Sequence, residues 1–273
     1  MVKEPAPSDN PKNVVNSVGK SFAVLQAFGP ENPVMSVSEV AAAAGLDRGT
    51  AFRLLHTLMS LGYLRSVPGK RFRLALKCLD LGYSALASHE LWDNSAPLLE
   101  DCVPDIVDAA SLGVLDGNDV IYLKRYDTLV VRHRVDARPG RKASNHAAAL
   151  SHAVLAWLPE DRQVEILESQ PRIKFSDRTL IELPELLERL RQVKAQGYAV
   201  SDGENAYGLR TVAVPILDEN ASPLAGVSLT TDATRMTMSE LIDTALPRAL
   251  SIAAELSRAI THLSGAQAGP ISA

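Results

Sequence analysis

The feature that most constrains the fold is a series of short helical segments, each ended by a glycine, with a short hairpin after the last. Apolar residues recur at helical spacing up to Gly29, and Ser36 and Glu39 form a capping-box pattern that begins the next segment. Gly45 ends that segment, and Asp47 can cap the third. The expected helices span 14–28, 37–44 and 48–61, and the expected strands span 63–65 and 71–74. This order of helices, tight turn and hairpin predicts a winged helix-turn-helix domain.

Charge is distributed unevenly along the chain. Residues 12–77 carry nine Lys and Arg against three Asp and Glu, a formal charge of +6, whereas the other residues carry 19 against 29, or −10. The whole-chain charge of −4 hides this contrast. A basic domain joined to an acidic one favours contact with a polyanion through the basic domain alone. The sequence therefore predicts a strongly salt-dependent affinity for nucleic acid.

The third helix and the hairpin supply most of the candidate DNA-contacting residues. Arginine and short polar residues near a helix N-terminus suit the major groove, where arginine reads guanine and threonine meets phosphate or a thymine methyl group. Basic residues at the hairpin tip can contact neighbouring phosphates. The candidates are Ser38, Arg48, Gly49, Thr50, Arg53, His56, Lys70, Arg71 and Arg73. The alternative, solvated charges on an ordinary three-helix domain, accounts for less of the complete motif.

From residue 111 onward the apolar period changes to two, which indicates a sheet. Residues 116–119 have the chemistry of a hairpin turn between strands at 111–115 and 120–125. Further strands are expected at 129–135, 211–217 and 224–231, and helices at 76–88, from 95–97 onward, and at 147–158, 164–169, 183–196 and 239–263. The predicted fold class is α/β (α+β), in which a helical linker joins the winged helix to a mainly antiparallel sheet flanked by helices.

These patterns divide the chain into five segments. They are a disordered proline-rich arm at 1–12, a DNA-binding domain at 13–75, a helical linker at 76–96, a second domain at 97–264 and a flexible tail at 265–273. No apolar run approaches the ~20 residues of a membrane-spanning helix. The N-terminus lacks a secretory apolar core, and two cysteines are too few for a disulfide scaffold. We therefore expect a cytoplasmic, nucleoid-associated protein without a membrane partner.

Sequence motifs of catalysis and metal binding are not found. The chain lacks a nucleophile elbow, a phosphate-binding loop and a dinucleotide-binding fingerprint. His133, His146 and His152 match no compact spacing of metal ligands. We expect no catalysis, no cofactor and no metal. The alternative function is a small-molecule-binding enzyme or sensor module with an accessory DNA-binding domain.

Several motifs, in both halves and in the right order, resemble the IclR family of bacterial transcription regulators. The matching stretches are Asn16 to Leu25, Ser38 to Ala41, Gly45-Leu46, Thr50 to Leu58, Gly62 to Leu64, Gly197 to Asn205 and Gly208 to Ile216. The resemblance extends from about residue 13 to residue 263. It implies a GAF-like effector-binding domain and homodimers, or dimers of dimers, on palindromic double-stranded operator DNA. The expected protein is a regulator of a catabolic operon, and its effector is a small organic or aromatic acid.

The resemblance also implies where that effector binds. The matching positions are Ala149, Leu150, Ser201, Asp202, Thr211, Ser228 and Thr230, to which we add His146, Arg132 and Arg134 as candidates. Strand alternation places the hydroxyls of Ser228 and Thr230 on one face, where both can reach one ligand. Residues 148–153 depart from the family pattern, because its Thr, Gly and Lys are all replaced. The identity of the ligand therefore does not carry over from relatives.

Two arginines on the expected strand at 129–135 leave two interpretations open. Alternation puts Arg132 and Arg134 on the same face of that strand. An inward arginine would bind a carboxylate through two parallel hydrogen bonds. Alternatively, both side chains belong to a basic edge strand that faces solvent.

Overall fold

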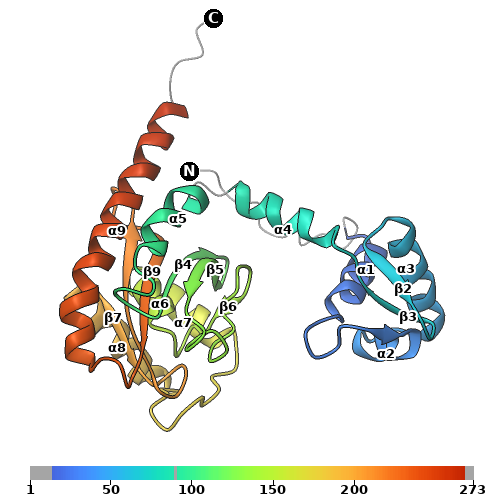
Figure 1. The fold of residues 1–273 in the computed structure, drawn as a ribbon, viewed down its shortest axis with the longest axis horizontal. Coiled ribbons are helices and arrows are strands. Elements are labelled where there is room, and N and C mark those ends of the chain that lie inside the picture. The colour runs from blue at the N-terminus through green and yellow to red at the C-terminus, as the bar shows by residue number, and fades with distance from the viewer. Residues whose placement is uncertain (1–13, 89–90, 268–273) are drawn as a thin grey trace, which may run out of the picture. The chain divides into compact units, whose positions relative to one another are not determined.

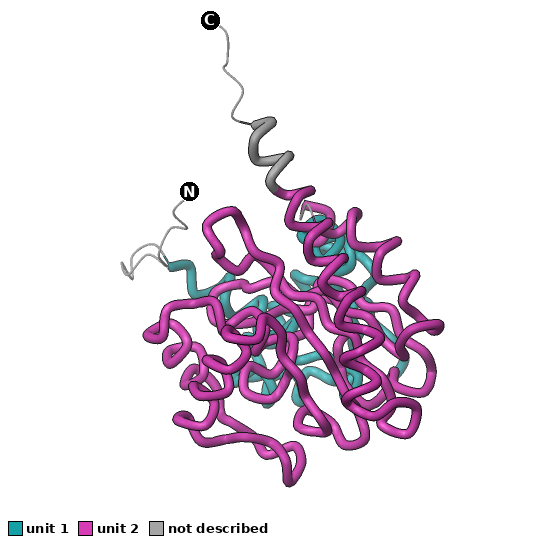
Figure 2. The backbone as a smooth tube through the Cα atoms, turned by 90° about the vertical axis from the view of Figure 1, so that its left-hand side faces the viewer, with its two compact units in different colours: residues 1–85 teal, residues 86–273 magenta. Residues whose placement is uncertain are grey.

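The computed structural model describes residues 14–88 and 91–267, and it divides the chain into two compact units, residues 1–85 and 86–273 (Figure 2). The predicted arm at 1–12 and most of the predicted tail at 265–273 lie outside the described residues. None of the described helices is long and apolar enough to span a membrane.

The first unit is a three-helix winged fold. Its elements are α1 (Asn16–Gln26), β1 (Met35–Ser36), α2 (Val37–Ala43), α3 (Arg48–Ser60), β2 (Leu64–Val67) and β3 (Arg71–Leu74) (Figure 1). Both predicted caps form, since Ser36 and Glu39 cap α2 reciprocally and the Asp47 carboxylate accepts from the Thr50 amide at 2.9 Å. The short strand β1, which the sequence did not predict, pairs with β3 beside the hairpin. Val24, Leu55 and Phe72 lie in the core that holds these elements together.

Two helices follow the hairpin. α4 (Cys78–Ala87) is close to the expected 76–88, and none of its residues is buried. α5 (Leu91–Glu100) begins before the expected 95–97 and contains Pro97 within its length. Leu91, Ser95 and Leu99 form its buried stripe, because they recur at the spacing of a single helix face.

The second unit is built on a six-stranded antiparallel sheet in the order β6-β5-β4-β9-β8-β7. The strands are β4 (Ala109–Asp116), β5 (Asp119–Asp127), β6 (Lys142–Ala143), β7 (Ala199–Asp202), β8 (Leu209–Leu217) and β9 (Pro223–Asp232). The predicted turn forms between β4 and β5, with Gly117 at a positive φ of 57°. Strands β6 and β7, at the two edges, were not predicted.

Helices cover both faces of this sheet (Figure 1). α5 and α9 (Met238–Gln267) pack on one face, and α6 (Ala149–Leu155), α7 (Glu160–Glu168) and α8 (Leu183–Gln196) belong to the other layer. α6 lies close to the sheet at two glycines. A Cβ at Gly113 would lie 2.8 Å from Leu150, and a Cβ at Gly226 would lie 2.9 Å from Val154. These two positions therefore set how closely α6 approaches the strands.

The predicted strand at 129–135 is wrong. This segment folds into successive turns, in which the Val131 and Arg132 amides donate to the Thr128 carbonyl and the Arg134 amide donates to the Val131 carbonyl. The segment therefore bonds to itself, and the short strand β6 takes the place beside β5. Val131 is buried, but Leu129 and Val130 are exposed, and strand alternation does not apply to a turn.

Candidate functional site

The N-terminal part of α3 presents a polar, cationic face. Arg48, Gly49 and Arg53 are exposed, Thr50 is half-buried, and the Arg53 Nη2 lies 3.4 Å from the Thr50 hydroxyl. Ala51, Leu55 and Leu58 fix the opposite face in the core. The arginines are therefore free to reach a groove, and the Asp47 cap holds the start of the helix in place.

His56 and Ser38 extend this surface in different ways. The His56 ring lies 4.3 Å from the Phe52 ring and 6.0 Å from the Phe72 ring, measured between centroids, so it joins α3 to the hairpin. Ser38 is exposed on α2.

The hairpin arginines differ in their surroundings. Lys70 and Arg73 are exposed, whereas the Arg71 guanidinium donates to the Val34 carbonyl at 2.8 Å and pairs with Glu39 at 3.3 Å. Hydrogen bonds from Ser36 hold the pKa of Glu39 below its ordinary value, with a smaller contribution from Arg71. Arg71 therefore braces the hairpin against the start of α2, while Lys70 and Arg73 face solvent.

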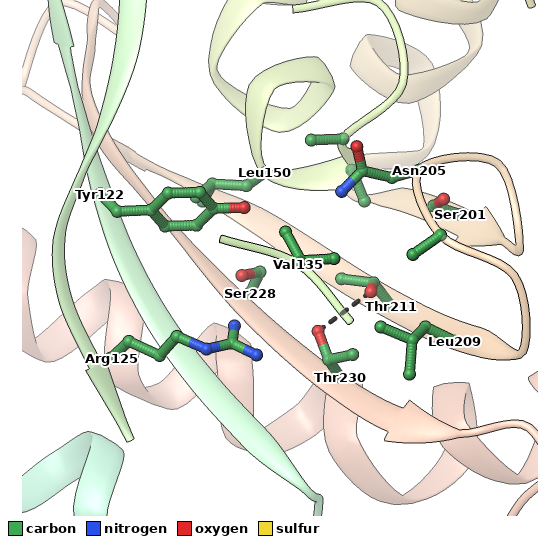
Figure 3. A pocket seen from close by; sticks show the side chains of 13 residues that line it. Tyr122, Arg125, Val135, Leu150, Ser201, Asn205, Leu209, Thr211, Ser228 and Thr230 are labelled. Carbon is green, nitrogen blue, oxygen red and sulfur yellow. Dashed lines mark hydrogen bonds between the residues drawn. The ribbon is translucent and has the colours of Figure 1, made fainter. Parts of the chain in front are cut away.

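A pocket opens between the sheet and α6 in the second unit (Figure 3). Two neighbouring cross-strand rows form its floor. One row runs through Arg125, Ser111 and Ser228 on β5, β4 and β9, and the next runs through Thr230, Thr211 and Ser201 on β9, β8 and β7. The lining is Tyr122, Arg125, Val135, Ala148, Ala149, Leu150, Ser201, Asn205, Ala206, Leu209, Thr211, Ser228 and Thr230.

Six of the ten candidate residues for the effector lie in this lining. They are Ala149, Leu150, Ser201, Thr211, Ser228 and Thr230. The Thr211 and Thr230 hydroxyls are 3.0 Å apart and bond to each other, whereas the structure records no hydrogen bond of the Ser228 hydroxyl among the described residues. Arg125, Tyr122 and Asn205 are in the lining but were not predicted.

The other four candidates lie elsewhere. Arg132 pairs with Asp127 at 2.8 Å, and Arg134 pairs with Asp232 at 3.0 Å on the rim of a neighbouring recess. His146 contacts the Ile173 carbonyl at 2.8 Å and stacks on Phe175. Burial lowers its pKa. Asp202 forms ion pairs with Arg178 and Arg210, so its carboxylate is already neutralised outside the lining.

The pocket lining contains one charged side chain, that of Arg125. Its Nε donates to Asp127 at 2.9 Å and its Nη1 donates to the Ser111 hydroxyl at 2.9 Å. Burial opposes ionisation of Asp127, but hydrogen bonds from Arg132 and Arg125 outweigh it and hold the pKa of this carboxyl below its ordinary value. Burial also raises the pKa of Tyr122, so this phenol stays protonated and can donate a hydrogen bond.

His152 lies behind the pocket, on α6. It is completely buried, and neither ring nitrogen has a hydrogen-bond partner among the described residues. Burial, together with the positive charge of Arg189, lowers its pKa to about 4. Arg189 is in turn held by Glu204 at 3.0 Å. His152 is therefore a neutral core residue near neutral pH.

Comparison with known proteins identifies relatives over both units. The family profile of the IclR helix-turn-helix domain matches residues 17–68, and that of the bacterial transcriptional regulator IclR C-terminal domain matches residues 83–258. The Pca regulon regulatory protein of Pseudomonas putida is 31% identical over 242 residues, which cover 89% of this chain and 83% of that protein.

Solved structures agree with these matches. A protein from Rhodococcus sp. RHA1, known from its crystal structure, superposes on this chain with a TM-score of 0.80 and is 30% identical to it in sequence. The match covers 92% of this chain and 100% of that one. An IclR homologue from Microbacterium hydrocarbonoxydans, solved with 4-hydroxybenzoate, has the same fold, with a TM-score of 0.75 and 21% identity over 90% of this chain and 99% of that one. The relatives are transcriptional regulators, not enzymes, and this chain belongs to the IclR family of DNA-binding bacterial transcription regulators.

Proposed function

We propose that this regulator controls a catabolic operon and that a small organic or aromatic acid, bound in the pocket between the sheet and α6, changes its affinity for operator DNA. The observation that carries the proposal is the pocket itself. It combines an arginine whose side chain is 8% exposed, a hydroxyl row and apolar side chains in one recess. A ligand alters DNA binding only if it binds two arrangements of the protein with different affinities.

The proposed DNA contact is the exposed face of α3 together with the hairpin. Arg48, Gly49, Thr50 and Arg53 are assigned to the major groove, and Lys70 and Arg73 to phosphates. Ser38 on α2 and His56 beside the hairpin border this surface, and Arg71 braces it. We assign residues 13–75 to DNA binding, 76–96 to a linker and 97–264 to effector binding.

We further propose that the protein acts as a homodimer, or a dimer of dimers, on a palindromic operator. Large apolar side chains are exposed on α1, among them Val18 and Phe22. α4 exposes Leu79, Leu81 and Tyr83. Large apolar side chains that are exposed in one copy are candidates for protein–protein contact, and a second copy would cover them.

The test uses an operator fragment selected from random DNA by the purified protein. Fluorescence polarisation then measures operator affinity with and without 4-hydroxybenzoate, benzoate and pyruvate, each in millimolar excess. We expect at least one of these acids to change the operator Kd severalfold. The double variant Ser228→Ala with Thr230→Val should bind the operator normally and lose that response.

Two outcomes would contradict the proposal. One is an operator affinity that none of the three acids changes. The other is an unchanged response in the double variant, which would mean that the effector does not bind in this pocket. A protein that converts a bound acid into a product would instead favour the enzyme alternative.

A further inference from the structure

Arg125 is a buried arginine with one side of its guanidinium group left unused. Its side chain is 8% exposed, and its Nε and Nη1 are fixed by Asp127 and Ser111 at 2.9 Å each. Among the described residues, no hydrogen bond is recorded for Nη2. Figure 3 shows the guanidinium group reaching into the pocket, toward Thr230 and below Ser228. Three N–H groups, one on Nη1 and two on Nη2, are therefore available to a ligand.

The charges around Arg125 do not balance. Asp127 is its ion-pair partner, but the same carboxylate also binds Arg132, through its other oxygen, at 2.8 Å. Two guanidinium groups and one carboxylate leave a formal charge of +1, and no Asp or Glu lines the pocket. A buried, incompletely compensated cation is costly, and a bound anion would offset that cost.

The rest of the lining limits the kind of anion. Val135, Leu150 and Leu209 form an apolar wall that favours a compact hydrocarbon or aromatic body. Tyr122 and Asn205 stand on the side of the pocket opposite Thr230 and offer polar groups to a second substituent (Figure 3). A small acid with one carboxylate and an apolar body matches this arrangement.

We propose that Arg125 binds the carboxylate of the effector through the edge that carries Nη1 and Nη2. Asp127 and Ser111 hold the guanidinium in place, and Arg132 acts as a positioning residue, since it draws part of the Asp127 charge away from Arg125. A carboxylate accepts two parallel hydrogen bonds from such an edge. This assignment rests on the proposed function, because it names the group that recognises the effector in the same pocket.

The experiment compares acids with their own amides by isothermal titration calorimetry on the full-length protein. The probes are benzoate with benzamide, 4-hydroxybenzoate with 4-hydroxybenzamide, and pyruvate with pyruvamide. We expect the wild-type protein to bind at least one acid tenfold or more tightly than its amide. Arg125→Gln should abolish that preference, and Arg125→Lys should keep only part of it because lysine lacks the planar fork.

Two further variants separate position from charge. Arg138→Gln is the matched control, because Arg138 is exposed and pairs with Asp136 outside the lining. It should bind the acids as the wild type does. Arg132→Gln should weaken acid binding severalfold and leave amide binding unchanged, since Arg132 is half-exposed and lies outside the pocket lining. Thermal melts of each free variant establish that it is folded.

Three results would overturn the assignment: equal binding of acids and amides by the wild type, an acid preference that survives in Arg125→Gln, or no binding of any acid. The wild-type comparison and Arg125→Lys keep the test decisive if Arg125→Gln does not fold. Operator binding measured in parallel separates the two proposals. Operator release by an uncharged compound would remove Arg125 as the anchor and keep the regulator. Acid binding through Arg125 without any effect on operator affinity would keep Arg125 as the anchor and contradict the proposed regulation by the acid.

Discussion

The two units use arginine in opposite ways. In the winged-helix unit Arg48 and Arg53 are exposed on α3, where they can approach a large polyanion. In the sheet unit Arg125 is buried, held by two partners and directed into a small pocket. Exposed cations act over a surface and are screened by salt, whereas a buried cation recognises one group at short range. The comparison shows that the burial of an arginine determines whether it can bind a polyanion or a single small anionic group.

The largest expected effect tests the role of the exposed arginines in DNA binding. The double variant Arg48→Ala with Arg53→Ala should weaken operator binding by about a hundredfold or more, since each base-reading contact contributes about 1–3 kcal/mol. Fluorescence polarisation at fixed salt measures the effect. The melting temperature should change little, because both side chains are exposed. Unchanged operator affinity would mean that α3 is not the recognition helix.

The next effect concerns close packing at a glycine of the sheet unit. Gly226→Ala would bring a Cβ within 2.9 Å of Val154 and 3.0 Å of Leu150, and we expect a loss of about 1–3 kcal/mol in the free energy of unfolding. Gly19→Ala in α1 is the control, because no atom lies within 4 Å of its Cβ and the exposed helix should gain about 0.5–1 kcal/mol. Urea denaturation of both variants checks this. Equal effects would show that α6 does not rest on Gly226.

A third effect comes from the buried histidine. The pKa of His152 is about 4, below the ordinary value for histidine, so the unfolded chain binds this proton first as the pH falls. Its contribution to stability is therefore full above about pH 6.5 and is lost progressively toward pH 4. Between pH 7 and pH 5 the loss is about 2 kcal/mol. Urea denaturation at pH 7 and pH 5 measures the free energy of unfolding of the wild type and of His152→Leu. The difference between the two pH values should be smaller in the variant. An equal loss of unfolding free energy between pH 7 and pH 5 in both proteins would contradict the neutral, buried state of His152.

The smallest effect distinguishes two neighbouring hairpin arginines. Arg73→Gln removes an exposed cation and should lower the slope of log affinity against log salt by about 1. Arg71→Gln loses its bond to the Val34 carbonyl and a half-exposed ion pair with Glu39, so we expect a loss of about 1 kcal/mol in stability. Salt titrations and melts of both variants separate the roles. The reverse pattern would make Arg71 the phosphate contact.

The winged-helix unit was largely predictable from sequence. Its signals are local, because capping residues such as Ser36 and Asp47 and helix-ending glycines act within a few residues of themselves. The helix α8 was predicted at its observed bounds for the same reason, since Gly197 supplies a left-handed C-cap with φ of 84°. What local chemistry did not reveal is β1, a two-residue strand that exists only because it pairs with β3.

The pocket was predictable only in part. The serine and threonine positions came from the resemblance and from alternation, which holds along the regular part of β9. Arg125 could not be found in this way, because the pairing of β4 with β5 contains a bulge between the partners of Leu112 and Gly113. The bulge leaves Leu123 unpaired and brings Tyr122 and Arg125 to the same face, although strict alternation would separate them. Arg132 was misplaced because its segment forms turns instead of a strand.

The central claim is that occupation of the pocket and binding of the operator are linked. The most direct measurement determines the Kd of the preferred acid from the acid–amide panel with and without operator DNA, and the Kd of the operator with and without that acid. Linkage requires the two ratios to be equal, and we predict equal ratios that differ from one by severalfold in the wild type. In the Ser228→Ala, Thr230→Val variant both ratios should be one. An acid that binds the wild type with both ratios equal to one would contradict the account.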